Sequence, residues 1–208
     1  MKKLLILDCD GVLYPASNIT HGDFVSAFEK TAKKFGKWDI VRNENLDSPI
    51  GFWERIYVIC GKDRAVFDEF CKNMVSNINY KKIRKSHILF NLLSSAKKKF
   101  DISILSDNHK YHLEQVMIHR FGMGVADFEA MGIKCYDITS TEKNGKFFPK
   151  CAEDSLSEFL KKKNKTVDEC IFVDNSMTNV SAGRKIGIET IYISHNRTLQ
   201  GYLKKINA

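Results

Sequence analysis

The feature that most constrains the fold is the stretch 3–14, a short apolar run that ends in two carboxylates, Asp8 and Asp10. An apolar run of this length predicts a buried strand, and Gly11 lets the backbone turn away after it. If the strand extends through Asp10, both carboxylates point to the same side, because side chains alternate along a strand. They would repel each other unless a divalent cation, a shared proton or a basic group lies nearby. A ligand site is therefore predicted at this strand end. The simpler alternative is that the two acids belong to a solvated turn after the strand.

The chain beyond residue 82 alternates between helical and strand patterns. Strands are predicted at 102–105, 170–173 and 190–193, with a weaker one near 133–138. The intervening segments have the spacing of amphipathic helices, at 88–100, 113–121, 152–160 and 179–185. Strands that alternate with helices predict an α/β fold with a doubly wound parallel sheet and right-handed crossovers.

The segment between the first strand and this alternating region has only helical patterns. Helices are predicted at about 20–35 and 49–60 and after Gly61. We therefore expect a core domain formed by residues 1–15 and 82–208, and a small helical domain, residues 16–81, inserted after the first strand.

Composition limits the partners of the chain. With 208 residues, 43% of them hydrophobic, it can bury a proper core. No apolar run is long enough for a membrane span or a signal peptide, so we expect a cytoplasmic protein with no membrane partner. Six cysteines lack any Cys-x-x-Cys pair, which indicates neither zinc nor a disulfide framework. The net charge of +8 would attract anionic substrates. The basic residues are not interleaved with aromatic residues as in nucleic-acid-binding proteins, so we expect no nucleic acid as a partner.

Polar residues follow three of the predicted strands at the same edge of the sheet. They are Asp8 and Asp10, then Ser106 and Asp107, then Asp174 and Asn175, and a lysine, Lys146, lies between the last two strands. Carboxylates with a magnesium ion, a hydroxyl, an amine and free backbone N–H groups can hold a phosphoryl group and stabilise its transfer.

These motifs resemble those of the haloacid dehalogenase (HAD) superfamily of phosphohydrolases. That family has Asp-x-Asp first, a Ser or Thr closing a strand second, a lysine third and an acidic pair fourth, with a helical cap between the first two motifs. The segments 8–17, 104–110 and 172–180 further resemble pyrimidine 5′-nucleotidase relatives, which carry Leu-Tyr after the first motif. The resemblance covers nearly the whole chain and implies that residues 16–81 are the cap.

The resemblance implies a role for each of these side chains. Asp8 would be the nucleophile and Asp10 the general acid and base, while Ser106 and the backbone N–H of Asp107 would bind the phosphate. Lys146 would neutralise the developing charge. Mg²⁺ would be held by residues of the first and fourth motifs, Asp8, Asp10, Asp174 and Asn175, with Asp174 either a direct ligand or a group that orients the lysine.

The sequence departs from the family pattern in three places. Asn175 stands where a second Asp is common, and an amide oxygen should bind Mg²⁺ more weakly. Asp107 stands where many relatives have Asn. Phe147 follows Lys146 where the pattern has proline; Pro149 favours Lys146 as the third-motif lysine, with Lys143 and Lys150 as the other candidates.

Other conspicuous side chains receive structural interpretations. His109, His112 and His119 lack the spacing of a metal pair and are expected at the surface or at a helix cap. Trp53, Phe52 and Tyr57 are expected in the core of the helical insert, with stacking on a nucleobase as the alternative. Cys9 is expected to pack on the opposite side of the strand from the two acids.

Together these observations predict a magnesium-dependent phosphatase for a small organic phosphate monoester, with nucleoside 5′-monophosphates as one candidate. The alternatives are a sugar-phosphate phosphomutase, a phosphoryl-receiving module and a protein that binds phosphate without turnover. Neither the particular ester nor the oligomeric state follows from the sequence.

Overall fold

The centre of the protein is a five-stranded parallel sheet. The computed structural model describes residues 2–38, 49–141, 146–152, 154–194 and 198–207. The strands lie in the order β3-β2-β1-β4-β5 and every pair is parallel. They are β1 (Lys3–Leu7), β2 (Phe100–Leu105), β3 (Lys134–Tyr136), β4 (Cys170–Asp174) and β5 (Glu189–Tyr192). The predicted α/β class and parallel sheet are confirmed.

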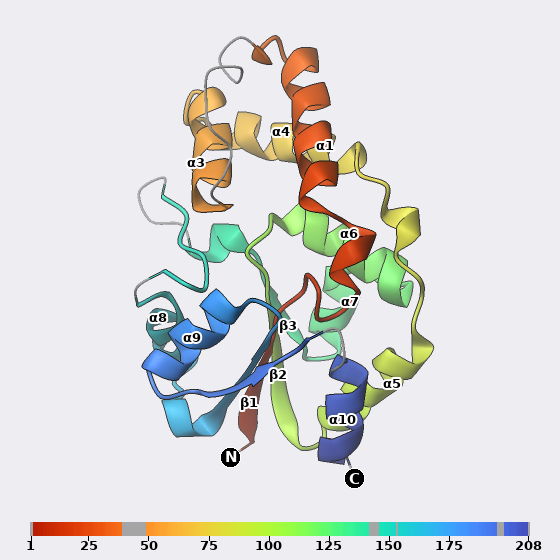
Figure 1. Ribbon diagram of the computed structural model, residues 1–208, viewed down its shortest axis with the longest axis vertical. Coiled ribbons are helices and arrows are strands. Elements are labelled where there is room, and N and C mark those ends of the chain that lie inside the picture. The colour runs from red at the N-terminus through yellow and green to blue at the C-terminus, as the bar shows by residue number, and fades with distance from the viewer. Residues whose placement is uncertain (1, 39–48, 142–145, 153, 195–197, 208) are drawn as a thin grey trace.

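Both faces of the sheet are covered, which explains why β1 is apolar throughout. Leu4 and Ile6 pack on one face with residues of α8 (Ser155–Lys162) and α9 (Met177–Lys185). Leu5 and Leu7 belong to the larger core on the other face, together with residues of α5 (His87–Ala96) and α10 (Leu199–Asn207). Figure 1 shows these two helical layers on either side of the strands.

Three helices gather beyond the carboxyl ends of the strands. They are α1 (His21–Lys34), α3 (Pro49–Ile59) and α4 (Arg64–Ser76), at the top of Figure 1. Helix α1 begins at Thr20, which forms a capping box with Asp23, and Asp63 caps α4 through the backbone N–H groups of Ala65 and Val66. Their buried faces join one continuous hydrophobic core with the sheet.

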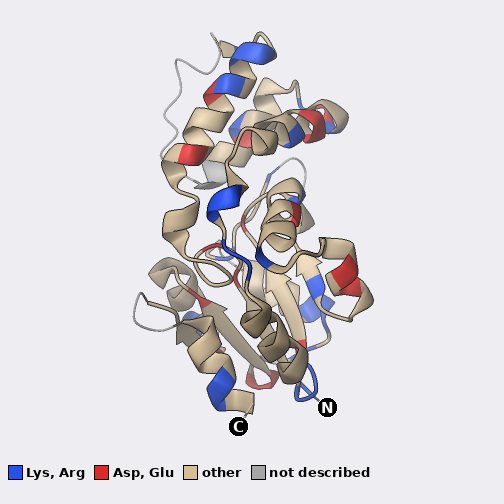
Figure 2. Ribbon diagram, turned by 90° about the vertical axis from the view of Figure 1, so that its right-hand side faces the viewer, with Lys and Arg blue, Asp and Glu red and all other residues tan. Residues whose placement is uncertain are grey.

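Two connections join these helices to the sheet, and they lie side by side. The first contains η1 (Ala16–Asn18) and the second contains η2 (Tyr80–Lys82). Asn18 Nδ2 donates to the carbonyl oxygen of Lys82 (2.5 Å), and Lys82 Nζ forms an ion pair with Asp23 (2.8 Å). The second connection runs down the facing side of Figure 2, where its lysines and arginines form a blue strap.

The remaining helices complete the crossovers. Helix α6 (Lys110–Phe121) follows β2, and α7 (Val125–Ala130) leads into β3; η3 (Ile138–Thr141) follows β3 and η4 (Val167–Glu169) precedes β4. Helices α7 and α10 were not predicted. Helix α7 has only six residues, of which Phe128 alone is buried, so its periodic signal is weak. Within the described ranges, no helix has the length and hydropathy needed to cross a membrane.

Phe172 tests the packing of the smaller core. It lies in the central part of β4 and is fully buried. Its ring packs close to Gly183 of α9, where an added Cβ would lie 3.1 Å from the ring. We expect Phe172→Ala to lower the free energy of unfolding by about 3–5 kcal/mol, because it leaves a cavity between sheet and helix. Ile88→Ala, on the exposed side of α5, should change it by less than about 0.5 kcal/mol. Urea unfolding followed by circular dichroism measures both values, and similar losses would contradict this description of the core.

Candidate active site

A cavity of about 780 Å³ lies where the sheet meets the helices α1 and α3. Its sheet side is formed by residues that follow β1, β2 and β4, together with the segment 149–151. The acids and the amide expected at the strand ends that line it are Asp8, Asp10, Asp107, Asp174 and Asn175. The carboxyl ends of the strands therefore bring these residues to one pocket, as expected for an open parallel sheet.

A buried ammonium group organises the carboxylates. Lys150 is 3% exposed, and its Nζ pairs with Asp8 Oδ1, with Asp174 Oδ2 (3.2 Å) and more distantly with Asp107 Oδ2 (3.7 Å). Nζ also donates to the carbonyl oxygen of Leu105 (3.0 Å). Burial lowers the pKa of Lys150, but the three carboxylates together raise it by more, so that its pKa lies well above the usual value. Lys150 is therefore a fixed positive charge at the ends of β1, β2 and β4.

The expectation that Lys146 is the lysine of the site is corrected by this geometry. Lys146 is exposed and is not among the residues that line the cavity, whereas Lys150 makes every contact expected of that lysine. The reason is the packing of Phe147, which is buried and stacks on Phe67 of α4 (ring centroids 5.5 Å apart). This anchor directs the following residues, through Pro149, toward the sheet. Lys143 lies outside the described residues.

Asp174 and Asp107 both serve to hold Lys150. Asp174 is fully buried; its Oδ1 accepts from the Ser176 N–H (2.7 Å) and its Oδ2 from Asn179 Nδ2 (3.0 Å) as well as from Lys150. Asp107 Oδ1 accepts from the backbone N–H of Lys150 (2.9 Å). The acidic side chain at position 107 thus points at the lysine segment, which explains how an extra carboxylate is tolerated here.

Asp8 lies between this cation and its acidic neighbours. Burial raises the pKa of Asp8 well above its usual value, and Asp174 and Asp10 add to the increase, while Lys150 opposes it. One ammonium therefore faces three carboxyl groups, those of Asp8, Asp107 and Asp174.

Asp10 has a different environment, made of hydrogen-bond donors. Its Oδ1 accepts from the Tyr14 hydroxyl and lies 2.7 Å from His112 Nε2; its Oδ2 accepts from Asn108 Nδ2 (2.8 Å). Burial raises the pKa of Asp10, but His112 and the hydrogen bonds from His112, Tyr14 and Asn108 lower it below the usual value. The two neighbouring carboxylates are therefore shifted in opposite directions.

The histidine prediction was wrong for His112. This side chain is completely buried, on the face of α6 that points to the site, and contacts Asp10. His109 does cap α6, accepting from the Tyr111 N–H (3.4 Å), but it too is buried and contacts Asp68 (3.2 Å). The sequence signal that could have identified His112 is its position three residues after a helix cap, on the apolar face with Leu113 and Val116.

Asn175 completes a group of oxygens suited to a cation. With its nitrogen turned toward them, its amide donates to Asp8 Oδ2 (3.1 Å) and to the carbonyl oxygen of Asp10 (2.7 Å). With the amide in the opposite orientation, its oxygen faces Asp8 Oδ2 and the carbonyl oxygen of Asp10, and oxygens are the ligands that Mg²⁺ prefers. Gly11, with a φ of 79°, makes room, since a Cβ there would collide with the Asn175 amide. Within the described ranges, no group of three or more His, Cys, Asp or Glu side chains is arranged to hold a metal ion, so a metal here would also use this carbonyl and amide.

Ser106 is buried at the end of β2, next to Asp10. It is 1% exposed; its Oγ accepts from the Asn108 N–H (3.1 Å) and lies 3.5 Å from Asp10 Oδ2. It is not among the residues that line the cavity, whereas Asp107 and Asn108 are. Cys9 is fully buried in the core, as predicted.

The wall opposite the sheet is aromatic and apolar. Phe24 of α1 and Phe52 and Trp53 of α3 line it, and Trp53 Nε1 donates to the carbonyl oxygen of Asp107 (3.0 Å). Phe52 and Trp53 are also largely buried, so the predicted core role is confirmed for both. Of the described residues that line the cavity, Lys150 is the only lysine or arginine.

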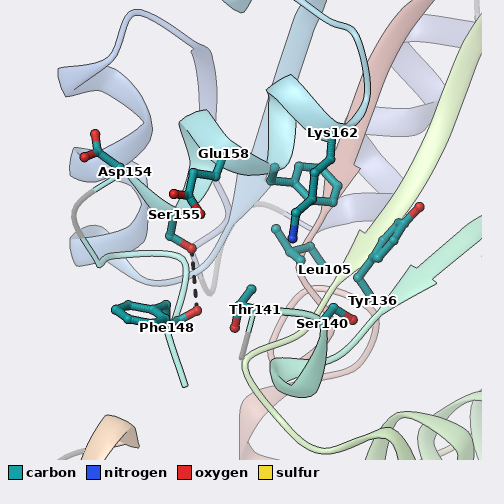
Figure 3. Close-up of a pocket in the computed structure, with 10 residues that line it drawn as sticks. Leu105, Tyr136, Ser140, Thr141, Phe148, Asp154, Ser155, Glu158 and Lys162 are labelled. Atoms are coloured by element: carbon teal, nitrogen blue, oxygen red, sulfur yellow. Dashed lines mark hydrogen bonds between the residues drawn. The ribbon is translucent and has the colours of Figure 1, made fainter. Parts of the chain in front are cut away.

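A second cavity, of about 410 Å³, lies between β3, η3 and α8 (Figure 3). It is lined by residues such as Tyr136, Thr141 and Lys162, and Ser155 Oγ donates to the carbonyl oxygen of Phe148 (3.5 Å) across one side. It contains none of the acids at the ends of β1 and β4. The chemistry of the strand ends is therefore confined to the larger cavity.

Comparison with solved structures identifies the fold. CbbY from Rhodobacter sphaeroides, in complex with phosphate, matches with a TM-score of 0.61 at 13% identity, over 95% of this chain and 88% of that chain. The HAD family enzyme BT-2542 from Bacteroides thetaiotaomicron, in complex with magnesium and inorganic phosphate, matches with 0.58 at 17% identity, over 93% and 95%. The haloacid dehalogenase-like protein SP0104 from Streptococcus pneumoniae matches with 0.52 at 14% identity, over 98% and 90%.

No protein-family model and no curated protein sequence matches the chain. The structural matches span nearly the whole of each chain, including the helices beyond the sheet. The protein therefore has the haloacid dehalogenase fold, as the resemblance of its motifs implied.

The two candidate lysines form a matched pair for mutation. Lys150→Met would leave Asp8 and Asp174 buried without their cation, and we expect the free energy of unfolding to fall by about 3–5 kcal/mol. Lys146→Met removes the same charge from an exposed position and should change it by less than about 0.5 kcal/mol. Urea unfolding of both variants measures the difference. Equal effects would show that Lys150 does not hold the carboxylates together.

Proposed function

We propose that the protein is a magnesium-dependent phosphatase of the HAD superfamily, acting on a small organic phosphate monoester. The observation that carries this proposal is the placement of Asp8 beside a buried ammonium group, with Asp10 next to it, in one cavity at the carboxyl edge of the sheet. A carboxylate beside fixed positive charge can attack phosphorus, and a neighbouring carboxyl group can move the proton that the reaction requires.

The reaction has two steps. In the first, an Asp8 oxygen bonds to phosphorus while the bond from phosphorus to the leaving oxygen breaks, and protonated Asp10 gives its proton to that oxygen. In the second, a water oxygen bonds to phosphorus and passes a proton to Asp10, while the bond from phosphorus to Asp8 breaks. Inorganic phosphate is released and both carboxyl groups return to their starting states.

Asp8, the carbonyl oxygen of Asp10 and Asn175 would hold Mg²⁺. The donor set fits, because the Asn175 amide oxygen, when turned inward, faces Asp8 Oδ2 and the carbonyl oxygen of Asp10. When bound, the ion supplies positive charge that keeps Asp8 ionised and stabilises the phosphoryl oxygens. Asp174 has both oxygens engaged by protein donors, so we assign it the role of orienting Lys150 rather than binding the ion.

Lys150 replaces Lys146 as the residue that neutralises charge on the phosphoryl group. Ser106 and the backbone N–H of Asp107 are assigned to the phosphate oxygens, at the end of β2. Residues 16–81 are assigned to a cap that covers the cavity and excludes water, since helices α1 and α3 supply its outer wall.

The lining of the cavity supports a substrate with one phosphate group and an apolar or aromatic portion. Lys150 is the only lysine or arginine among the described lining residues, and its ammonium group already forms ion pairs with Asp8 and Asp174. Phe24, Phe52 and Trp53 present rings, which suits the base of a nucleoside 5′-monophosphate. A CbbY variant was crystallised with xylulose-1,5-bisphosphate; here the described lining residues include no lysine or arginine for a second phosphate group, which supports a monophosphate.

Phosphate release tests the proposed function directly. The purified protein with Mg²⁺ should release inorganic phosphate from p-nitrophenyl phosphate and from nucleoside 5′-monophosphates, and EDTA should abolish the release. Asp8→Asn should lower kcat by at least about a thousandfold, because the nucleophile is lost. Phosphate binding by the unsubstituted protein without any release, across a broad panel of esters, would instead support a protein that only binds phosphate.

Asn175→Asp tests the proposed metal site. The added carboxylate should tighten Mg²⁺ binding roughly tenfold, because affinity for this ion rises with the number of charged ligands. Calorimetric titration with Mg²⁺ measures this without reference to activity. Asn73→Asp adds the same charge on α4, where Asn73 contacts Lys34 instead of the cavity, and should leave Mg²⁺ affinity unchanged. Equal affinities in all three proteins would exclude Asn175 as a ligand.

A further inference from the structure

His112 is a buried side chain with a hydrogen-bond partner on each ring nitrogen. It is completely buried, with Nε2 2.7 Å from Asp10 Oδ1 and Nδ1 2.7 Å from the Tyr80 hydroxyl. Burial and the charge of Asp10 raise the pKa of Tyr80, so this hydroxyl keeps its proton and can donate to Nδ1. We therefore assign the Nε2–H tautomer, in which the ring donates to Asp10.

Aromatic rings cover the imidazole of His112, which is completely buried. The ring of Phe24, on α1, lies 5.0 Å from the imidazole, and the ring of Tyr80, in η2, lies 5.5 Å from it. A hydrogen bond shielded in this way is electrostatically stronger than one in water. It also joins three elements distant in sequence, since Asp10 follows β1, Tyr80 belongs to the second connection and His112 to α6.

The two oxygens of Asp10 are held differently. Oδ1 accepts from Tyr14, which is largely buried, and from His112. Oδ2 contacts Asn108, which lines the cavity. One oxygen is therefore anchored in the protein interior, while the other is the one that a leaving oxygen or a water can reach.

We propose that His112, held by Tyr80, is a positioning residue that fixes the Asp10 carboxyl group for proton transfer to the leaving oxygen and from the attacking water. This rests on the proposed phosphatase function and adds a residue from α6 to it. A histidine needed only for packing could form its hydrogen bonds with any buried partner and would not need to contact this acid. Here its Nε2 is directed at the acid beside the nucleophile, and its Nδ1 is fixed by the Tyr80 hydroxyl.

The test compares two phosphate esters that differ in their need for a proton. In uridine 5′-monophosphate, an alkyl ester, the leaving group would be a poorly stabilised alkoxide and needs a proton from the acid. In p-nitrophenyl phosphate the leaving group is p-nitrophenolate, a stable anion that needs no proton. For His112→Leu, we expect kcat/KM for the alkyl ester to fall about a hundredfold, which is roughly the usual contribution of general acid catalysis. We expect kcat/KM for the aryl ester to fall less than about threefold. The variant should also show a burst of p-nitrophenolate, because hydrolysis of phosphorylated Asp8 needs the base.

Two milder variants keep the test valid if His112→Leu folds poorly. Tyr80→Phe removes only the hydroxyl that fixes Nδ1 and should give the same pattern with a smaller loss, about tenfold for the alkyl ester. His112→Gln can place an amide N–H near the position of Nε2–H and should recover most of the activity on that ester. His87→Gln, at the exposed start of α5, is the matched control and should resemble the unsubstituted protein.

The outcomes separate the two proposals. An equal fall in kcat/KM for both esters in His112→Leu and Tyr80→Phe, with no burst, would show that His112 is only structural. Unchanged kinetics in both variants would overturn the positioning role as well. Failure of the unsubstituted protein to release phosphate from either ester would overturn the phosphatase function, and that result is read without any variant.

Discussion

The site depends on a single buried ammonium group, that of Lys150, held among the carboxylates of Asp8, Asp107 and Asp174. Removing such charges from water costs several kcal/mol for each ion, and only close ion pairs and hydrogen bonds offset that cost. The ends of β1, β2 and β4 and the segment carrying Lys150 must therefore come together in one arrangement. The parallel sheet provides it, because all its strands end at the same edge.

Beside this charged cluster, Asp10 is held by neutral donors and a histidine. The two acids are only two residues apart, yet the pKa of Asp8 is raised and that of Asp10 is lowered. The proposed roles need the reverse order, because a nucleophile must be ionised and a general acid must be protonated when the ester binds. For Asp8 to act as a nucleophile, further positive charge must lie nearby, which is consistent with the oxygens that face Asn175.

The similarity to known structures and the features of this chain answer different questions. The matches are 13–17% identical and establish a fold that can support several activities. The proposed chemistry instead comes from the residues in the cavity, and the proposed substrate class from its single described lysine and its aromatic wall. Helices α1 and α3 thus bear on the proposed selectivity, while the strand ends bear on the proposed reaction.

The sequence alone determined the α/β class, most of the elements and the acids at the strand ends, because these follow from local periodicity and from strands ending in polar residues. It could not select Lys150 over Lys146, since that choice depends on Phe147 packing against Phe67 of a distant helix. Nor could it assign His112 to Asp10, or show that Asp174 is already engaged by Ser176 and Asn179. Those contacts join segments far apart in the chain or depend on side-chain direction, which only the tertiary structure fixes.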